Sequence, residues 1–271
     1  MDAMNVKTLV LPVAGMGTRL MPLTLNRPKA LVGVCGKPLL EYMIEDGWAS
    51  GLREIVLVAS PQHLQDFETY LEGAKKRFSG LVAHLRIQEQ AFGNGRALLE
   101  AKDIIGKVPF AVRFCDDLVF GKENSLAGLL RVHREKQASV ILLERVPEQD
   151  AHRYGVVGLR NPEGGPVYAI THIVEKPKQE EGKPHMLPSN LAVVGAYILT
   201  PSILKHLEDA LPDAPEATDG LPLTVGFERE LASESPIFGL ELSGTRFDCG
   251  VLEGIQKAEE FLCEGKVARD K

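Results

Sequence analysis

The sequence has little of several features that define specialised classes of protein. Aromatic residues make up 6% of its 271 residues, while 44% are hydrophobic and 25% are charged. This composition excludes collagen-like and disordered chains and small disulfide-rich domains. The chain has no excess of positive charge either, because its 31 Lys and Arg residues are outnumbered by 37 Asp and Glu residues, which gives a net charge of −6. We therefore expect no nucleic acid and no anionic membrane as a partner, and any bound phosphate must be neutralised locally.

The chain is also poor in cysteine and has no convincing membrane segment. Its four cysteines are Cys35, Cys115, Cys249 and Cys263. None of them forms a C-x-x-C pair, so reduced thiols are predicted rather than a zinc site or a disulfide framework. The longest stretch without a charged residue, 184–204, contains several prolines and polar residues that hydrocarbon would penalise. Asp2 stands where a signal peptide has basic residues, so we expect a cytoplasmic protein.

Apolar strand-like runs alternate with longer amphipathic segments through the first half of the chain. The predicted elements are Lys7 to Val13, Pro38 to Ala49, Glu54 to Ser60, Gln62 to Lys76, Val82 to Gln88, Gly95 to Ile105, Phe110 to Phe114 and Ser125 to Lys136. This β-α-β-α succession predicts a parallel sheet covered on both faces. Ligands are expected beyond the carboxyl ends of its strands.

The second half is richer in strands. Strands are predicted at Val140 to Leu143, Tyr168 to Val174 and Leu191 to Leu199. Thr200 and Pro201 read as the cap and first residue of a helix, and Gly254 to Cys263 as a late helix. We therefore expect a single α/β domain over residues 1–271, built on a mixed, mostly parallel sheet.

A glycine-rich loop follows the first strand. Gly15-Met16-Gly17-Thr18-Arg19 is followed by Pro28-Lys29. Small residues let backbone amides approach an anion, and the two cations neutralise its charge, which predicts a phosphate-binding loop. An ordinary turn with solvated cations is the alternative. Leu20 replaces the third glycine of a dinucleotide-binding G-x-G-x-x-G motif, and Pro38 stands where a Walker A loop needs a hydroxyl.

Carboxylates follow the predicted strand 110–114 and recur late in the chain. Asp116 and Asp117 lie just beyond that strand, and Asp248 precedes Cys249 and Gly250. Magnesium bound to a triphosphate takes one or two carboxylates, so these residues are candidate ligands; the alternative is that Asp116-Asp117 caps a turn. If both segments are extended, Cys115, Asp117 and Cys249 point away from the ligand side and the cysteines pack in the core.

An acid and a base leave a predicted strand together in Val174-Glu175-Lys176-Pro177. Glu175 could accept hydrogen bonds from a ligand, and Lys176 could neutralise a phosphate. Gly195, in an otherwise bulky strand, would let a ligand approach the backbone. Taken alone, an adjacent Glu and Lys is more often a solvated surface pair.

Several separated motifs together resemble the sugar-1-phosphate nucleotidylyltransferases, and within them the bacterial UTP:glucose-1-phosphate uridylyltransferases more than the thymidylyl or adenylyl relatives. These motifs are Ala14-Gly15-Met16-Gly17-Thr18-Arg19 with Pro22, Pro28-Lys29, Gly36-Lys37-Pro38, Tyr154-Gly155-Val156-Val157, Val174-Glu175-Lys176-Pro177, Ser189 to Gly195 and Phe247-Asp248-Cys249-Gly250. The resemblance covers nearly the whole chain. It implies a Rossmann-like α/β/α nucleotidyltransferase fold, use of Mg²⁺, and a homodimer or homotetramer.

The resemblance also implies a role for each candidate residue. Asp116 and Asp248 would bind the metal, Arg19 the leaving β/γ-phosphates, Lys29 the triphosphate at the reacting centre, and Lys176 the sugar phosphate. Glu175, Gly155 and Gly195 would contact the sugar. The backbone of Ala14, Gly15 and Gly17 would approach the nucleotide, with Gln88 and Gly93 reading a uracil edge and Gln90 as a competitor for Gln88.

The implied reaction is direct transfer from UTP to glucose 1-phosphate, giving UDP-glucose and pyrophosphate. The rivals are a catalytically weak regulatory paralogue, a transferase using dTTP or another sugar 1-phosphate, and an NAD-dependent oxidoreductase, which Leu20 disfavours. Two departures from the family pattern are Arg96, in Gly93-Asn94-Gly95-Arg96-Ala97, and Val225, in Leu223-Thr224-Val225-Gly226. They leave the local charge near the nucleotide and any oligomer contact open.

Overall fold

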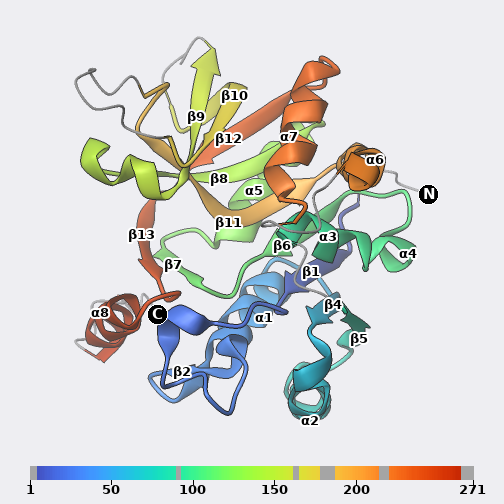
Figure 1. The fold of residues 1–271 in the computed structure, drawn as a ribbon, viewed down its shortest axis with the longest axis vertical. Helices are drawn as coiled ribbons and strands as arrows, with labels where there is room; N and C mark the ends of the chain where they lie inside the picture. The colour runs from blue at the N-terminus through green and yellow to red at the C-terminus, as the bar shows by residue number, and fades with distance from the viewer. Residues whose placement is uncertain (1–4, 90–92, 161–164, 178–186, 214–219, 264–271) are drawn as a thin grey trace.

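A nine-stranded sheet forms the centre of the computed structural model, which describes residues 5–89, 93–160, 165–177, 187–213 and 220–263 (Figure 1). Its strands run in the order β5-β4-β1-β6-β11-β8-β12-β10-β9. They are β1 Thr8–Pro12, β4 Glu54–Ala59, β5 Val82–Ile87, β6 Phe110–Arg113, β8 Ser139–Arg145, β9 Gly155–Arg160, β10 Val167–Glu175, β11 Leu191–Leu199 and β12 Ile237–Glu241. Two short pairs stand apart: β2 Gly33–Val34 with β3 Lys37–Pro38, and β7 Asp117–Gly121 with β13 Gly244–Asp248.

The sheet is mixed, as predicted. β5, β4, β1 and β6 are parallel neighbours. β11 then runs antiparallel to both β6 and β8, β12 is parallel to β8, and β10 is antiparallel to β12 and β9. The parallel half therefore directs all its carboxyl ends to one edge, where β11 enters in the opposite direction.

Helices cover both faces of the sheet and make a three-layered α/β/α structure. They are α1 Leu39–Ala49, α2 Leu64–Arg77, α3 Gly93–Leu99, α4 Lys102–Ile105, α5 Ser125–Lys136, α6 Pro201–Ala210, α7 Leu223–Ala232 and α8 Leu252–Cys263. Short 3₁₀ turns include Thr18–Leu20 and Lys29–Leu31. None of the helices in the described part of the chain is long and apolar enough to cross a membrane.

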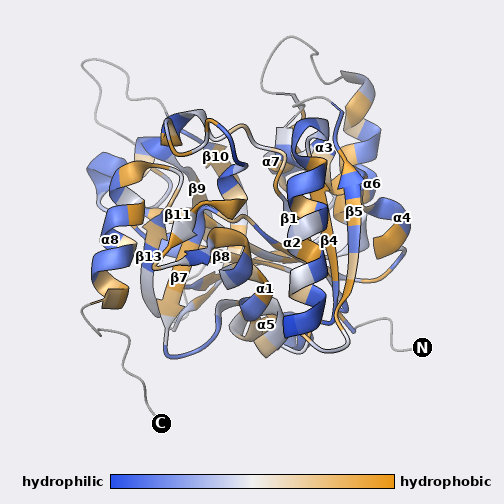
Figure 2. Cartoon of the chain, turned by 90° about the horizontal axis from the view of Figure 1, so that it is seen from below, coloured by the Kyte–Doolittle hydropathy of each residue, from blue (hydrophilic) through white to orange (hydrophobic). Residues whose placement is uncertain are grey.

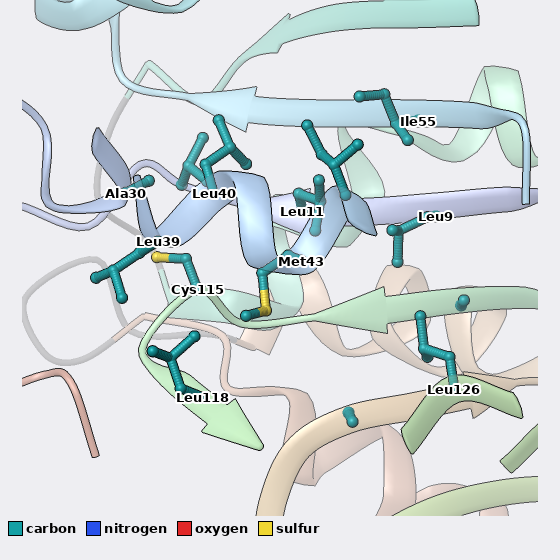
Figure 3. Packing of buried hydrophobic residues seen from close by; sticks show 14 of the residues in the cluster. Leu9, Leu11, Ala30, Leu39, Leu40, Met43, Ile55, Cys115, Leu118 and Leu126 are labelled. Carbon is teal, nitrogen blue, oxygen red and sulfur yellow. The ribbon is translucent and has the colours of Figure 1, made fainter. Parts of the chain in front are cut away.

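The alternation of side chains along each strand creates two cores. In β1, Leu9 and Leu11 face one hydrophobic cluster and Val10 faces the other. The first cluster contains residues of α1, α2, α5 and α8, and the second contains residues of α3, α4, α6 and α7. Figure 2 shows the result as helices with hydrophobic and hydrophilic stripes over apolar strands, and Figure 3 shows the first cluster around Leu11, Leu40 and Met43.

Two predicted elements match the structure in full, and one prediction was wrong. Helix α5 and strand β11 have the predicted bounds. The helix predicted over Gly95 to Ile105 is instead the pair α3 and α4, and α3 begins at Gly93. The Gly95 N–H donates to the Leu221 carbonyl oxygen at 2.9 Å, and a Cβ at Gly95 would lie 2.8 Å from that oxygen. This close packing against the segment before α7 is a tertiary contact with no local sequence signal.

Candidate active site

A cleft of about 930 Å³ opens where the carboxyl ends of the parallel strands meet β11. One wall consists of the segments that follow β1, β5 and β6, as expected for a ligand site in an α/β sheet. The opposite wall consists of the start of β9, the end of β10 and the middle of β11. The predicted site residues that line the cleft are Ala14, Gly15, Lys29, Gln88, Gly93, Asp116, Gly155, Glu175, Lys176 and Gly195.

A partly buried ion pair, in which the Asp116 side chain is 28% exposed, forms the centre of the first wall. Nζ of Lys29 lies 2.5 Å from Oδ2 of Asp116, and the Lys29 side chain is 14% exposed. Burial alone would lower the pKa of Lys29, but the adjacent Asp116 carboxylate more than offsets this and holds that pKa above its usual value. Burial alone would raise the pKa of Asp116, yet Lys29 holds it below the usual value. Both groups are therefore charged at neutral pH.

Two further charged groups of the predicted site, Asp248 and Arg19, converge with Lys29 on Gly250. A Cβ built there would lie 2.8 Å from Oδ1 of Asp248, 3.1 Å from Nη2 of Arg19 and 3.3 Å from Nζ of Lys29. A side chain at this position would therefore fill the space between these groups. Arg19 and Asp248 lie beside the cleft lining and reach the Lys29–Asp116 pair through this space.

The β7–β13 pair explains why two distant aspartates meet. Its register places Asp248 opposite Asp117, and the Cys249 N–H donates to the Asp116 carbonyl oxygen at 2.7 Å. Cys115 and Cys249 are buried in the first core cluster, so they pack as predicted. Figure 3 shows Cys115 among Leu39, Met43 and Leu118.

The donor set fits a metal that is shared with a phosphorylated ligand. Oδ1 of Asp248 accepts the Gly250 N–H at 3.0 Å, and Asp116 is held by Lys29. Among the residues that the structure describes, no group of three or more His, Cys, Asp or Glu is placed to hold a metal ion. Two hard carboxylates alone suit a magnesium ion that keeps water and phosphate oxygens as its other ligands.

Asp117 connects the two walls of the cleft. Its Oδ2 accepts the Gly195 N–H of β11 at 2.8 Å, and its Oδ1 accepts from Nη1 of Arg246 at 2.6 Å. Nε of Arg246 in turn donates to Oε2 of Glu144 in β8. Burial raises the pKa of Asp117 against the attraction of Arg246. The Asp117 side chain thus points away from Lys29, as the alternation of side chains predicts. It also connects the two walls through Gly195 and Arg246.

The second wall presents its charges to solvent. Glu175 pairs with Gly155 across β10 and β9, and a Cβ at Gly155 would lie 3.1 Å from Oε2 of Glu175. Nζ of Lys176 lies 3.8 Å from Oε1 of Glu175, and the two side chains are 66% and 47% exposed. Lys176 has a φ of 44°, and its N–H donates to the Tyr154 carbonyl oxygen. The left-handed backbone of this non-glycine residue costs roughly 1–3 kcal/mol, so the surrounding structure must hold it.

The glycines of the loop after β1 serve two different purposes. Gly17 has a φ of 64°, and a Cβ there would lie 2.9 Å from Cβ of Lys29. Its absence lets the loop pack directly on the residue that carries the buried cation. At Gly15 a Cβ would meet nothing within 4 Å. Gly15 therefore exposes its backbone to the cleft, where an anion or a base can approach it.

The predicted base-contacting residues lie together at the end of β5. The Gln88 side chain is 5% exposed, and its Nε2 donates to the Gly93 carbonyl oxygen at 3.1 Å. Its role toward a base stays a prediction. Gln90, its predicted competitor, lies outside the described residues. Gly195 lines the cleft too, but the space of its missing side chain is filled by Asp117 and Phe114. Packing alone therefore requires a glycine there, whatever a sugar contacts.

Comparison with known proteins agrees with this geometry. A model of the nucleotidyl transferase family matches residues 7–262. This chain belongs to that family. It is 32% identical to a UTP--glucose-1-phosphate uridylyltransferase of Staphylococcus epidermidis, over 98% of this chain and 96% of that protein.

Solved structures match over similar lengths. A UDP-glucose pyrophosphorylase in complex with UDP-glucose superposes with a TM-score of 0.83 at 30% identity, covering 96% of this chain and 99% of that one. A UTP-bound UGPase from Acinetobacter baumannii gives 0.80 at 30% identity, covering 98% and 95%. The fold of the nucleotidyl transferase is thus shared along almost its entire length.

Some cleft residues of this nucleotidyl transferase carry no clear signal in the sequence. Arg153 lines the second wall, half-exposed, with its guanidinium 5.6 Å from the Tyr154 ring centroid. Its place directly before the Tyr154-Gly155 motif is the signal that could have marked it as a further cation. Asn94 lines the first wall, and its Oδ1 accepts the Leu223 N–H at the start of α7. Its role in closing the cleft depends on a contact between distant segments.

The two departures from the family pattern have local explanations in the nucleotidyl transferase. Nε of Arg96 donates to Oε1 of Glu100, which directly follows α3, and Arg96 is not among the residues that line the cleft. Val225 packs against the second core cluster from α7. Neither residue therefore adds a charge to the cleft itself.

Proposed function

We propose that this protein transfers the uridylyl group of UTP to glucose 1-phosphate, forming UDP-glucose and pyrophosphate. One observation carries the proposal: a cationic and carboxylate centre of Arg19, Lys29, Asp116 and Asp248 faces the Glu175–Lys176 pair across a single cleft. Such a site can hold two phosphorylated substrates at once. The names of the relatives, and the UDP-glucose and UTP bound in two matching structures, favour these substrates.

The reaction needs alignment and charge neutralisation rather than a protein nucleophile. An oxygen of the ionised sugar phosphate attacks the α-phosphorus of UTP in line, and pyrophosphate leaves. We assign Lys29 to the triphosphate at the reacting centre, Arg19 to the departing β/γ-phosphates and Lys176 to the sugar phosphate. In this assignment the first half of the chain binds the nucleotide, the second half binds the sugar phosphate, and residues 1–271 act as one domain.

The residues that would hold a metal are Asp116 and Asp248. Nucleotidyltransferases of this family generally use a divalent metal, and the two carboxylates fit Mg²⁺ shared with phosphate oxygens. When bound, the ion would neutralise charge that develops on the phosphates. We further propose a cytoplasmic enzyme that acts as a homodimer or homotetramer.

Uracil is the proposed base. A pyrimidine edge with one N–H and two carbonyls needs both an acceptor and donors, and the Gln88 amide beside the backbone of Gly93 and Gly15 offers both. Thymine adds only a methyl group, whose rejection is worth roughly 1–3 kcal/mol, so partial use of dTTP is expected. Purines are excluded more completely by their size.

The test is kcat/KM for UTP, dTTP, ATP and GTP with glucose 1-phosphate, repeated for UTP with galactose 1-phosphate. We expect UTP with glucose 1-phosphate to be the best pair. ATP or GTP outrunning UTP would overturn the base assignment, and dTTP clearly outrunning it would make the protein a thymidylyltransferase. Nucleotide binding without turnover would mark a regulatory protein instead.

A further inference from the structure

Two exposed cysteines from distant parts of the chain touch at the surface. Sγ of Cys35 lies 3.3 Å from Sγ of Cys263, although 228 positions separate them in the sequence. The Cys35 N–H donates to Oε1 of Glu259 at 3.2 Å, which lies one helical turn before Cys263. The two sulfurs need to approach by only about 1.3 Å to reach the bonding distance of about 2.0 Å. The fold therefore presents a dithiol that the spacing of the cysteines does not predict.

Cys35 is held in place by the segment that follows the Lys29 turn. It lies in the tight turn between β2 and β3, with a φ of 47°, and Gly36 beside it has a φ of 75°. Two such residues form the turn that closes a two-residue hairpin. The Tyr42 hydroxyl of α1 donates to the Val34 carbonyl oxygen at 2.9 Å and anchors this hairpin. The position of the Cys35 sulfur is therefore set by the hairpin and by α1.

Cys263 is held by the helix that follows Asp248. A Cβ at Gly254 would lie only 1.7 Å from the Asp248 carbonyl oxygen, so the start of α8 packs directly on the residue predicted to bind metal. Farther along α8, the Phe261 ring centroid lies 5.2 Å from that of Phe247 in β13. Figure 1 shows α8 next to β13, close to the β2 segment. Both sulfurs thus stand on elements with fixed positions.

We propose that Cys35 and Cys263 are an oxidation site, at which a reversible disulfide fastens the β2–β3 hairpin to the end of α8. This bond would join the segments that carry Lys29 and Asp248 through one covalent link. Because the sulfurs already touch, the bond forms without moving either charged group, so it stabilises the folded protein and leaves turnover intact. The proposal does not depend on the substrates assigned above.

The oxidant is a small-molecule disulfide of the glutathione class. A protein thiolate attacks one sulfur of the oxidised glutathione, giving a mixed disulfide and releasing one glutathione thiolate. The second protein thiolate attacks the protein sulfur of this intermediate and releases the second glutathione. Two protein thiols are oxidised, one glutathione disulfide is reduced, and the two thiol protons pass to the released thiolates.

The surroundings set the rate of this exchange. Partial desolvation, the neighbouring Cys263 and Glu259 raise the pKa of the Cys35 thiol to about 11. Only the thiolate attacks a disulfide, so exchange is slow at neutral pH and faster at about pH 8.5. Cys115 and Cys249 are buried, and burial raises the pKa of each thiol to about 12. Exchange therefore favours the exposed pair.

The test compares the wild type with Cys35→Ser, Cys263→Ser and the double variant, each incubated with oxidised glutathione at about pH 8.5 and then freed of it. In the wild type we expect the loss of two of the four thiols, one cross-linked peptide joining Cys35 to Cys263, and a monomer on non-reducing gels. Closing so long a loop should raise Tm by roughly 5–10 °C, and dithiothreitol should reverse the rise.

The single variants are the matched controls. Each keeps one of the two thiols, so it should gain one glutathione, and its Tm should not rise. The proposal is overturned if the wild type gains only glutathione adducts, if its disulfide includes Cys115 or Cys249, or if covalent dimers are the sole product. An oxidised wild type that melts at the same temperature as the reduced protein, or that loses the nucleotidyl transfer activity of the reduced protein when the disulfide forms, would also overturn it.

Discussion

The two walls of the cleft hold their charges in opposite ways. On the first wall the partly buried Lys29 and Asp116 lie 2.5 Å apart, whereas on the second Lys176 and Glu175 lie 3.8 Å apart with both side chains exposed. The first pair is already neutralised and oriented before any ligand arrives, and the second is free to exchange water for a ligand. We infer that the first wall supplies preorganised electrostatics and the second adaptable binding.

Substitution of the metal-site aspartates should have the largest effect. It should also separate the catalytic contribution of these two residues of the first wall from their contribution to stability. Asp116→Ala and Asp248→Ala are each expected to lower kcat/KM by roughly 10³-fold or more at limiting Mg²⁺. Asp116→Ala should in addition destabilise the fold by about 1–3 kcal/mol, between the values for exposed and for buried pairs, because it leaves the partly buried Lys29 cation without its partner. Turnover during a magnesium titration and thermal unfolding measure the two effects separately.

Asp209→Asn is the control for these variants, since it neutralises an exposed carboxylate that pairs with Lys205 on the surface of α6, away from the cleft. It should change neither quantity. Near-normal turnover of Asp116→Ala or Asp248→Ala would remove the metal assignment. Equal melting temperatures for the two variants would show that the partly buried ion pair contributes nothing to stability.

Asp117→Ala tests whether the walls are held together by the connection between them. Its kcat/KM should fall by roughly 10–100-fold, less than in the two variants above. It should nevertheless destabilise the fold by about 3–5 kcal/mol. The reason is that the Gly195 N–H and the Arg246 guanidinium both lose their buried acceptor. Asp117→Asn retains one acceptor oxygen and should recover part of the stability. A melting temperature equal to that of the wild type in Asp117→Ala would contradict this role.

Removing one cation from each wall should separate the two substrates. Lys176→Ala is expected to raise KM for glucose 1-phosphate roughly tenfold, and Arg19→Ala to raise KM for UTP by a similar factor. Both side chains are exposed, so Tm should hardly change. Initial rates with each substrate varied in turn provide the measurement. If both variants lose affinity for both substrates equally, the assignment of UTP to the first wall and of glucose 1-phosphate to the second is wrong.

The smallest effect is expected at Arg96. Arg96→His removes the partly exposed pair of Arg96 in α3 with Glu100 just beyond that helix, outside the cleft lining. Such pairs contribute about 0–1 kcal/mol, and kcat/KM should stay within about twofold of the wild type. A large change in KM for UTP would show that this helix reaches the nucleotide wall, and the comparison of the walls would then have to include it.

Much of the central sheet and its helices could be predicted because their signals are local. Helix α5 and strand β11 have the predicted bounds, and the strands leading to Gly15 and Asp116 lie where their apolar runs stand. Hydrophobic periodicity over such lengths leaves few alternatives. The short strands β7 and β13 were not predicted, because each is stabilised by pairing with the other across most of the chain. Their pairing places Asp248 beside Asp116.

The types of residue at the site, the order of its motifs and the alternation of strands and helices can all be recognised in the amino-acid sequence. The glycine loop, the separated aspartates and the Glu175–Lys176 pair can each be identified alone, because each depends on neighbours in the chain. Their mutual contacts arise only on folding: the Lys29–Asp116 pair, the Asp117 connection to Gly195 and Arg246, and the contact between Cys35 and Cys263. Such contacts result from the packing of whole layers, and no local pattern records the distances that this packing creates.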